Sequence, residues 1–251
     1  MKRSAIPFER EIYSEICTRD GVKAGEIAKR LSLDRTAVNR CLYLSPFMRE
    51  LCYRDDSYRW HGLIRQTRPH AGLSDFCGWY GTVGEFLSVP EEEWFEGLLD
   101  GCKRIGRNLN DTRGLFHSFR DTREVMLSLF RDFPEVPHRD WEIAFELRIN
   151  RARYIRIYAD VLVITEDRVF SLEFKMKDRI EETEVSQAAK YCRYLEVVFG
   201  PAYDVIPCLV LTRAEDLYTY AQLSGTTAEV PVCSGDMLFN LFDEYLGFLT
   251  D

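Results

Sequence analysis

The sequence lacks the clustered metal ligands and long apolar runs that mark several classes of protein. Its four histidines stand apart, and none of its eight cysteines forms a CxxC pair. Structural zinc and iron–sulfur sites need such clusters, so we expect neither. No run approaches roughly 18 apolar residues, and the N-terminal "MKRSAIPFEREIY" has no apolar stretch like that of a signal peptide. We therefore predict a cytoplasmic protein with reduced core cysteines and no membrane segment.

The chain also lacks an overall positive charge, internal repeats and low-complexity tracts. Its formal net charge is −8, so no global basic field attracts nucleic acid. Residues 1–60 nevertheless contain twelve Lys and Arg against nine Asp and Glu, a net of +3, while the other 21 basic and 32 acidic residues give −11. Hydrophobic residues make up 46% of the 251 positions, which is enough for a globular core. A mildly basic N-terminal segment, residues 1–60 (the head), therefore precedes an acidic remainder (the body).

Three helical patterns open the chain. Apolar residues recur at helical spacing over residues 8–19, 24–31 and 35–44. Asp34 is a natural N-cap for the third helix, because its side-chain oxygen can accept hydrogen bonds from free backbone N–H groups. The residues of this helix that we expect to face the core are Val38, Leu42 and Leu44.

A hairpin is predicted after the helices. Two β-like runs after Pro46 flank the turn residues Asp55, Asp56 and Ser57. Three helices and a hairpin, with the segment "GEIAKRLSLDRTAVNRCLYL", resemble the winged helix-turn-helix superfamily. The resemblance implies a domain over residues 1–62.

This resemblance implies that the third helix enters the major groove of DNA and that the wing contacts phosphates. The wing candidates are Arg54 and Arg59. The polar candidates on the helix are Arg35, Thr36, Asn39 and Arg40. The alternative is a protein contact or dimerisation, which the small net charge of the head and its acidic turn favour.

Residues 63–120 are predicted to be a helical connector region. In "LSVPEEEWFEGLLDGCKRIG", Ser88 with Glu91 suits a capping box, and Pro90 suits the first turn of a helix. The residues expected to line the buried face of this helix are Trp94, Leu98 and Cys102.

From Trp141 the pattern changes to β-branched and aromatic residues at strand spacing. A long helix over residues 111–133 precedes this change. The expected order after it is three strands, a helix, a strand and a closing helix, at residues 141–149, 153–164, 167–176, 181–199, 203–212 and 234–249. We therefore predict a mixed α/β domain over residues 121–251.

The strands carry charged side chains among apolar ones. In "SLEFKMKD", Glu173 and Lys175 share one face while Phe174 points into the core, because side chains alternate along a strand. The turn at residues 165–167 folds the preceding strand alongside, so we expect Asp160 beside Glu173. Two carboxylates so placed offer hard oxygen ligands to Mg²⁺ or Mn²⁺. Lys175 could orient or deprotonate a water, or neutralise charge on a phosphate.

Asp160, twelve intervening residues and the Glu-Phe-Lys of the next strand resemble the PD-(D/E)xK nuclease superfamily. Ala159 stands where the family name has Pro. Gln187 and Tyr191, in "QAAKY", resemble the QxxxY element of its RecB-like and lambda-exonuclease-like branches, and would contact substrate backbone or support the site. The resemblance implies a restriction-endonuclease-like mixed sheet flanked by helices.

The resemblance also implies a third acid. We expect it to be Glu146 in the first strand, with Glu124 on the preceding helix as the alternative. The carbonyl of Phe174 would also face the metal. The expected metal ligands are therefore Glu146, Asp160, Glu173 and the carbonyl of Phe174. Lys177 either extends a basic edge over the phosphate or is a solvated lysine at the strand end.

Together the two resemblances imply an Mg²⁺- or Mn²⁺-dependent deoxyribonuclease recruited by the winged helix. Such a fusion would fit DNA repair, mobile-element control or defence against foreign DNA, and nothing in the residues chooses among these. We expect DNA rather than RNA because both resemblances are to DNA-acting families. A homodimer or a protein partner would use the winged helix or residues 76–133. The alternative is a catalytically silent nuclease-fold protein that binds DNA as a transcription regulator or scaffold. Separately, the ordinary interpretation of Glu173 and Lys175 is an exposed strand with a surface ion pair.

Overall fold

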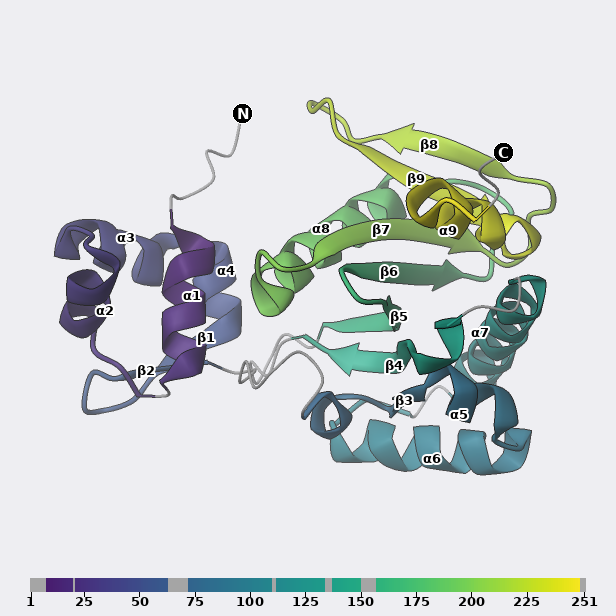
Figure 1. Cartoon of the computed structure of the whole chain (residues 1–251), viewed down its shortest axis with the longest axis horizontal. Helices are drawn as coiled ribbons and strands as arrows, with labels where there is room; N and C mark the ends of the chain where they lie inside the picture. Colours follow the sequence, from purple (N-terminus) through teal and green to yellow (C-terminus); the bar gives the residue numbers. More distant parts are fainter. Residues whose placement is uncertain are drawn as a thin grey trace.

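The computed structural model describes residues 8–19, 21–62, 72–109, 112–133, 137–149 and 157–248. These residues form an N-terminal head and a body built on one large sheet (Figure 1). The elements of the head are α1 (Glu9–Thr18), α2 (Ala24–Leu31), α3 (Arg35–Leu44), α4 (Pro46–Leu51), β1 (Cys52–Arg54) and β2 (Trp60–Gly62).

The head follows the predicted order of three helices and a hairpin. The carboxylate of Asp34 accepts hydrogen bonds from the backbone N–H groups of Thr36 and Ala37, so it caps α3 as expected. Val38 and Leu42 are fully buried. Leu44 was expected inside but is 59% exposed, because it lies at the last position of α3, beyond the turn that packs on the other helices.

The segment after Pro46 differs from the prediction. A strand-like run was expected there, but residues 46–51 form the short helix α4 before β1 begins. The hydroxyl of Ser45 caps this helix by accepting a hydrogen bond from the N–H of Met48 at 3.2 Å, and Pro46 occupies its first turn. The cap and the proline together favour a helical turn over an extended strand.

The body contains a seven-stranded mixed sheet in the order β3-β4-β5-β6-β7-β9-β8. Its strands are β3 (Trp79–Thr82), β4 (Glu142–Arg148), β5 (Tyr158–Ile164), β6 (Arg168–Lys175), β7 (Asp204–Leu211), β8 (Tyr218–Gln222) and β9 (Glu229–Ser234). The pairs β6–β7 and β7–β9 are parallel, and the other neighbours are antiparallel. Strands β4 to β7 and the turn at residues 165–167 were predicted, whereas β3, β8 and β9 were not.

Helices cover both faces of the sheet. They are α5 (Val83–Ser88), α6 (Glu91–Arg104), α7 (Thr112–Asp132), α8 (Glu182–Phe199) and α9 (Leu238–Leu246), joined by the short 3₁₀ helices Leu73–Phe76, Pro137–Asp140 and Gly235–Met237. One face packs against α8 and the head, and α1 contacts α8 (Figure 1). The opposite face packs against α5, α6, α7 and α9. The sheet core is therefore shielded on both sides, as a mixed α/β architecture requires.

The connector contains the helix α5, which was not predicted, in addition to β3. Ser88 does not cap α6; it ends α5, where its hydroxyl donates hydrogen bonds to the carbonyls of Gly84 and Glu85. The capping box lies instead at the start of α5, between Thr82 and Glu85. The predicted buried row of Trp94, Leu98 and Cys102 is confirmed.

The described cysteines, which are all except Cys17, are buried and form no disulfide among themselves. Across the described parts of the chain, every helix falls short of the length and apolar character needed to cross a membrane.

Helix α6 lies unusually close to the start of β3. A Cβ atom added at Gly101 would lie 1.8 Å from the carbonyl oxygen of Gly78. A Cβ atom added at Gly78 would in turn lie 3.1 Å from the Cβ atom of Glu146 on β4. The two glycines therefore set the distance between α6 and the strands beside Glu146.

Replacing Gly101 with alanine should lower the free energy of unfolding by about 1–3 kcal/mol, because overpacking outweighs the better helix propensity of alanine. Gly97→Ala on the same helix is the matched control. Its Cβ atom would lie 3.4 Å from Trp79, an ordinary contact, so this variant should be unchanged or up to about 1 kcal/mol more stable. Chemical denaturation followed by tryptophan fluorescence measures both. Equal stability of the two variants would contradict the expected clash.

Candidate active site

Three acidic side chains lie in one row across β4, β5 and β6. The β4–β5 register pairs the neighbours of Glu146 with the neighbours of Asp160, so the two acids lie opposite each other. The β5–β6 register, continued one step beyond its last pair, sets Asp160 opposite Glu173. Glu146 and Glu173 are only 4% and 3% exposed, and Asp160 is half-buried. Each carboxylate therefore needs a compensating partner, because an unpaired buried charge is costly.

Strands β5 and β6 separate at this row. Their ladder ends at Val161 and Leu172, although β6 continues to Lys175. Beyond the last pair, the N–H of Phe174 donates to Oδ2 of Asp160 at 2.8 Å, where a strand carbonyl would otherwise accept. The carboxylate of Asp160 thus takes the place of a backbone acceptor for the N–H of Phe174, at the point where the two strands separate.

Glu173 is held by a lysine and an amide. Nζ of Lys175 lies 2.6 Å from Oε1 of Glu173, and Nε2 of Gln187 donates to the same oxygen at 2.6 Å. Gln187 also donates to the hydroxyl of Tyr191 at 3.0 Å. Gln187 and Tyr191 are four residues apart on α8 and share one helix face, as the sequence predicted. The helix therefore reaches the row of acids from one side of the sheet.

Glu146 has an unusual backbone and a different partner. Its φ of 55° is rare for a residue other than glycine, and such conformations cost about 1–3 kcal/mol and cluster at functional sites. The strand changes face here, since Phe145 packs on the α7 side and Leu147 on the α8 side. Nε of Arg107 lies 2.9 Å from Oε2 of Glu146, and a second guanidinium nitrogen lies 3.4 Å from Oε1. The guanidinium also lies 4.6 Å from the centre of the Tyr158 ring.

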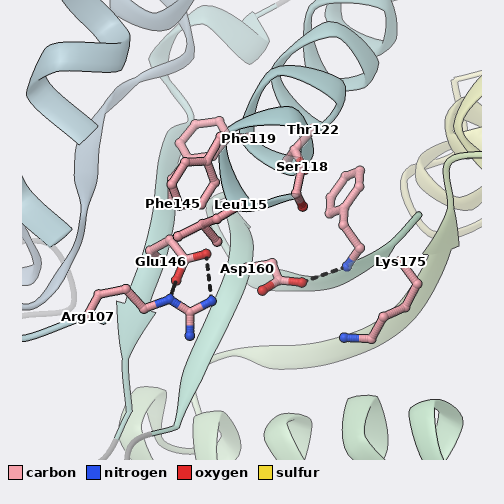
Figure 2. Close-up of a pocket in the computed structure, with 10 residues that line it drawn as sticks. Arg107, Leu115, Ser118, Phe119, Thr122, Phe145, Glu146, Asp160 and Lys175 are labelled. Atoms are coloured by element: carbon pink, nitrogen blue, oxygen red, sulfur yellow. Dashed lines mark hydrogen bonds and ion pairs between the residues drawn. The ribbon is translucent and has the colours of Figure 1, made fainter. Parts of the chain in front are cut away.

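A pocket of about 180 Å³ opens beside the row. Figure 2 shows the carboxylate of Asp160 between Glu146 and Lys175, with α7 above them. From α7 the pocket is lined by Leu115, Ser118, Phe119 and Thr122. The residues from the sheet and from the segment after α6 are Arg107, Phe145, Glu146, Asp160, Phe174 and Lys175. The pocket therefore combines acids, two cations and an apolar wall.

The charges of these groups depend on one another. Burial raises the pKa of Glu146 to about 8, and Asp160 adds to the rise while Arg107 opposes it. Burial and the neighbouring Asp160 raise the pKa of Glu173 to about 8, and burial also raises the pKa of Asp160. Burial alone would lower the pKa of Lys175, but the carboxylates of Glu173 and Asp160 outweigh it and raise that pKa. The lysine therefore stays protonated, while the acids compete for positive charge.

Burial and ion pairs bear on the alternative interpretations of four residues. Glu173 is buried, so an exposed strand with a surface ion pair is wrong. Glu146 is buried too, so it is not a solvent-facing strand residue. Glu124 on α7 is exposed and lies outside the pocket lining. Lys177 binds Glu181 and Glu184, each at 2.8 Å, rather than the row of acids.

The head residues expected to meet DNA lie on the surface. Arg35, Thr36 and Arg40 are exposed on α3, and Asn39 is half-buried. The wing candidates have partners within the head. Arg54 donates to the hydroxyl of Tyr43 at 2.8 Å and lies over the Tyr58 ring, and Arg59 donates to the carbonyl of Gly21 at 2.7 Å.

The sequence did not predict the part of the site formed by Arg107, Tyr158 and the pocket wall from α7. No motif or spacing links Arg107 to Glu146, which lies 39 residues further along the chain. A helix-period apolar stripe on α7 predicts only that one face is buried, and does not predict what that face covers.

As the side chains stand, no group of three His, Cys, Asp or Glu residues among those described is arranged to hold a metal ion. The carboxylates of Glu146 and Glu173 are turned to Arg107 and Lys175 instead. Oε2 of Glu146 is nevertheless buried without a hydrogen-bond donor, because the nearby Arg107 nitrogen is within ion-pair distance but is not aligned to donate.

Comparison with known proteins places the chain in no family. No protein-family profile and no curated protein matches it. Among solved structures, protein VC1899 from Vibrio cholerae aligns with a TM-score of 0.27 and 11% identity over 97% of this chain and 50% of that chain. The chain thus spans half the length of that protein. A TM-score this low does not establish a shared fold.

The raised pKa values predict a pH-dependent stability. Between about pH 5 and about pH 8, the folded protein retains protons that the same carboxyl groups lose on unfolding. The free energy of unfolding in EDTA should therefore fall as pH rises through this window. In Glu146→Gln the side chain at position 146 does not titrate. The free energy of unfolding of this variant, relative to that of wild type, should therefore rise by at least about 1 kcal/mol between about pH 5 and about pH 8.

Denaturant titrations at several pH values measure this difference. Glu124→Gln, an exposed glutamate on α7, is the matched control and should follow the wild type. Parallel pH profiles for wild type and Glu146→Gln would contradict the raised pKa of Glu146.

Proposed function

We propose that the chain is an Mg²⁺- or Mn²⁺-dependent nuclease of the PD-(D/E)xK type that hydrolyses phosphodiester bonds of DNA, in DNA repair or defence against foreign DNA. The observation that carries the proposal is the row of Glu146, Asp160 and Glu173 beside the ammonium group of Lys175. Adjacent buried carboxylates repel one another, and such clusters with strongly shifted pKa values are typical of functional sites.

The topology of the body supports the same family. Strands β4, β5 and β6 form an antiparallel meander, α8 follows, and β7 returns parallel to β6. This order of three strands, a helix and a strand is the one that the sequence resemblance implies for a restriction-endonuclease-like core.

The donor set fits Mg²⁺ or Mn²⁺. Carboxylate and carbonyl oxygens are the hard ligands that these ions prefer. Oε2 of Glu146 is buried and accepts no hydrogen bond, so a cation bound there would compensate this buried oxygen. The residues that would hold the ion are Glu146, Asp160, Glu173 and, through its carbonyl, Phe174. When bound, such an ion lowers the pKa of a coordinated water and stabilises charge on a phosphate.

Lys175 acts as a fixed positive charge in this proposal. The carboxylates of Glu173 and Asp160 raise its pKa, which favours the protonated form. In this form Lys175 can orient the attacking water by donating a hydrogen bond, and can neutralise charge that develops on the phosphate. Its contact with Glu173 holds the ammonium group within the pocket.

Gln187 and Tyr191 position Glu173. The amide of Gln187 fixes one carboxylate oxygen of Glu173, and the Tyr191 hydroxyl accepts from the same amide. Burial raises the pKa of Tyr191 to about 12, so its hydroxyl remains neutral and able to donate to a nucleic-acid backbone. Both the supporting and the substrate-contacting roles implied by the QxxxY resemblance are therefore compatible with this geometry.

The head is proposed to be a winged helix that recruits the body to DNA. Its order of α1, α2, α3 and the β1–β2 hairpin, with Arg35 and Arg40 exposed on α3, supports this role. The wing is a weaker candidate surface, because Arg54 and Arg59 already bind groups within the head.

A catalytically silent DNA-binding or scaffold protein is the second candidate function. Two observations favour it. Arg107 and Lys175 form ion pairs with Glu146 and Glu173, and among the described residues no group of three acidic, His or Cys side chains is arranged to hold a metal ion. Metal binding and cleavage assays separate the two functions.

Purified wild-type protein should cut DNA when Mg²⁺ or Mn²⁺ is added. Asp160→Asn, Lys175→Gln and Glu146→Gln should each reduce the rate by at least about 100-fold, because each removes a ligand or a charge at the reacting phosphate. Glu124→Gln should retain activity, which also decides between the two candidates for the third acid.

Cleavage of single- and double-stranded DNA and of RNA is followed on gels, with circular dichroism to verify folding. The nuclease proposal fails if wild type binds neither metal and cuts none of these substrates while the variants fold normally.

For the head, the double variant Arg35→Glu/Arg40→Glu should weaken DNA binding at least about ten-fold and reduce its salt dependence, because phosphate contacts are lost. Lys103→Glu, at an exposed position on α6, is the charge-matched control for one reversal. Fluorescence anisotropy at several salt concentrations measures both. Unchanged affinity of the double variant would instead favour a protein-contact role for α3.

A further inference from the structure

Arg107 is the one pocket-lining cation that no sequence motif contains. Its backbone is fixed, since its N–H donates to the carbonyl of Cys102 at 2.8 Å. Arg148 holds the same segment by donating to the carbonyl of Ile105 at 2.7 Å. The side chain is 27% exposed, and its guanidinium contacts Glu146 and Tyr158. The segment therefore presents the guanidinium to Glu146 from a fixed backbone position.

The guanidinium and a metal ion would compete for the same carboxylate. Both oxygens of Glu146 face nitrogens of Arg107, at 2.9 and 3.4 Å. A guanidinium does not lose its proton in proteins, so the positive charge beside Glu146 can be removed only by moving the side chain. A divalent ion on the same oxygens would face that charge at close range and be repelled.

The pocket offers the displaced guanidinium another partner. Arg107 and Lys175 line the same pocket, on either side of Asp160 (Figure 2). The carboxyls of Glu146 and Asp160 line the pocket as well, and a metal ion on these acids would leave the two cations available to an anion. The planar fork of arginine matches the oxygens of a phosphate. Tyr158 can keep one face of the guanidinium covered while its nitrogens turn.

We propose that Arg107 is an internal cation whose ion pair with Glu146 keeps metal ions from this carboxylate. When a divalent metal ion binds Glu146, the guanidinium of Arg107 moves to a phosphate of the substrate. This rests on the proposed nuclease function and makes Arg107 a positioning residue that couples metal binding to substrate binding. The arrangement explains why the acids are paired rather than grouped for metal in the structure. It also gives the buried row a counter-charge when no metal is bound.

Isothermal titration with Mn²⁺ tests the competition. Arg107→Gln should bind Mn²⁺ about ten-fold more tightly than wild type, a difference of about 1.4 kcal/mol, because Glu146 is freed and a repelling charge is removed. Arg120→Gln, which breaks an exposed pair with Glu91 on the surface, is the matched control and should equal wild type. The titration is run about one pH unit above the pKa of Glu146, so that the freed carboxylate is ionised.

Substrate binding should change in the opposite direction. The KM of Arg107→Gln for DNA should rise about ten-fold at saturating Mn²⁺, because a phosphate contact is lost. A merely structural role for Arg107 would weaken Mn²⁺ and DNA binding together. Opposite shifts of the two constants therefore support the proposal, and parallel shifts overturn it.

A second measurement needs no variant at Arg107. Phenylglyoxal modifies accessible arginines, and the modified residues are identified by mass spectrometry. In the wild-type protein, Mn²⁺ should increase the modification rate of Arg107 and leave that of Arg120 unchanged. An unchanged rate at Arg107 in a protein that binds Mn²⁺ would overturn the proposal.

The two proposals fail in distinguishable ways. If wild type cuts DNA but Arg107→Gln binds Mn²⁺ no more tightly, the role of Arg107 is wrong and the nuclease function stands. If wild type cuts nothing and neither protein binds Mn²⁺, the nuclease function fails and the role of Arg107 fails with it.

Discussion

A row of three carboxyl groups across β4, β5 and β6, two of them buried and one half-buried, needs positive charge or N–H donors from the elements that pack around it. Each acid receives a partner from a different element. Glu173 binds Lys175 on its own strand and Gln187 on α8, and Asp160 binds the N–H of Phe174. Glu146 binds Arg107, which follows α6. The helices on both faces of the sheet are therefore tied to the same cluster of charges.

Packing near Glu146 connects the fold to this cluster. The close approach of Gly101 to Gly78 sets α6 against the beginning of β3, next to β4. The end of α6 then carries Arg107 to Glu146, whose positive φ marks the point where β4 changes face. A local backbone strain is thus maintained by tertiary packing, which is what its persistence requires.

The ion pairs of Glu146 with Arg107 and of Glu173 with Lys175 account for the way the acids are arranged. Three carboxyl groups lie side by side across neighbouring strands, yet among the described residues no group of three acids is arranged to hold a metal ion. Arg107 pairs with Glu146 and Lys175 with Glu173, and burial raises the pKa of both carboxyl groups to about 8. A further cation near these carboxyls would favour their charged form, because a nearby opposite charge lowers a carboxyl pKa.

Much of the site could be predicted because its parts are close together in the sequence. Glu173 and Lys175 share a face through the two-residue period of a strand, and a tight turn at residues 165–167 brings Asp160 alongside. Gln187 and Tyr191 share a face through the period of a helix. Most of the helices and the central strands were predicted for the same reason, since periodicity is a local property.

Contacts across long stretches of sequence were decided only by the tertiary structure. The pairing of Arg107 with Glu146, the unexpected strands β3, β8 and β9, and the exposure of Leu44 leave no periodic signal. Even for Glu173, whose shared face with Lys175 was predicted, burial was not predictable, because strand alternation does not say which face is covered. The sequence by itself determined which charged residues share a strand or helix face. Burial and packing, summed over the whole core, decided which of those charges meet and which cation neutralises each acid.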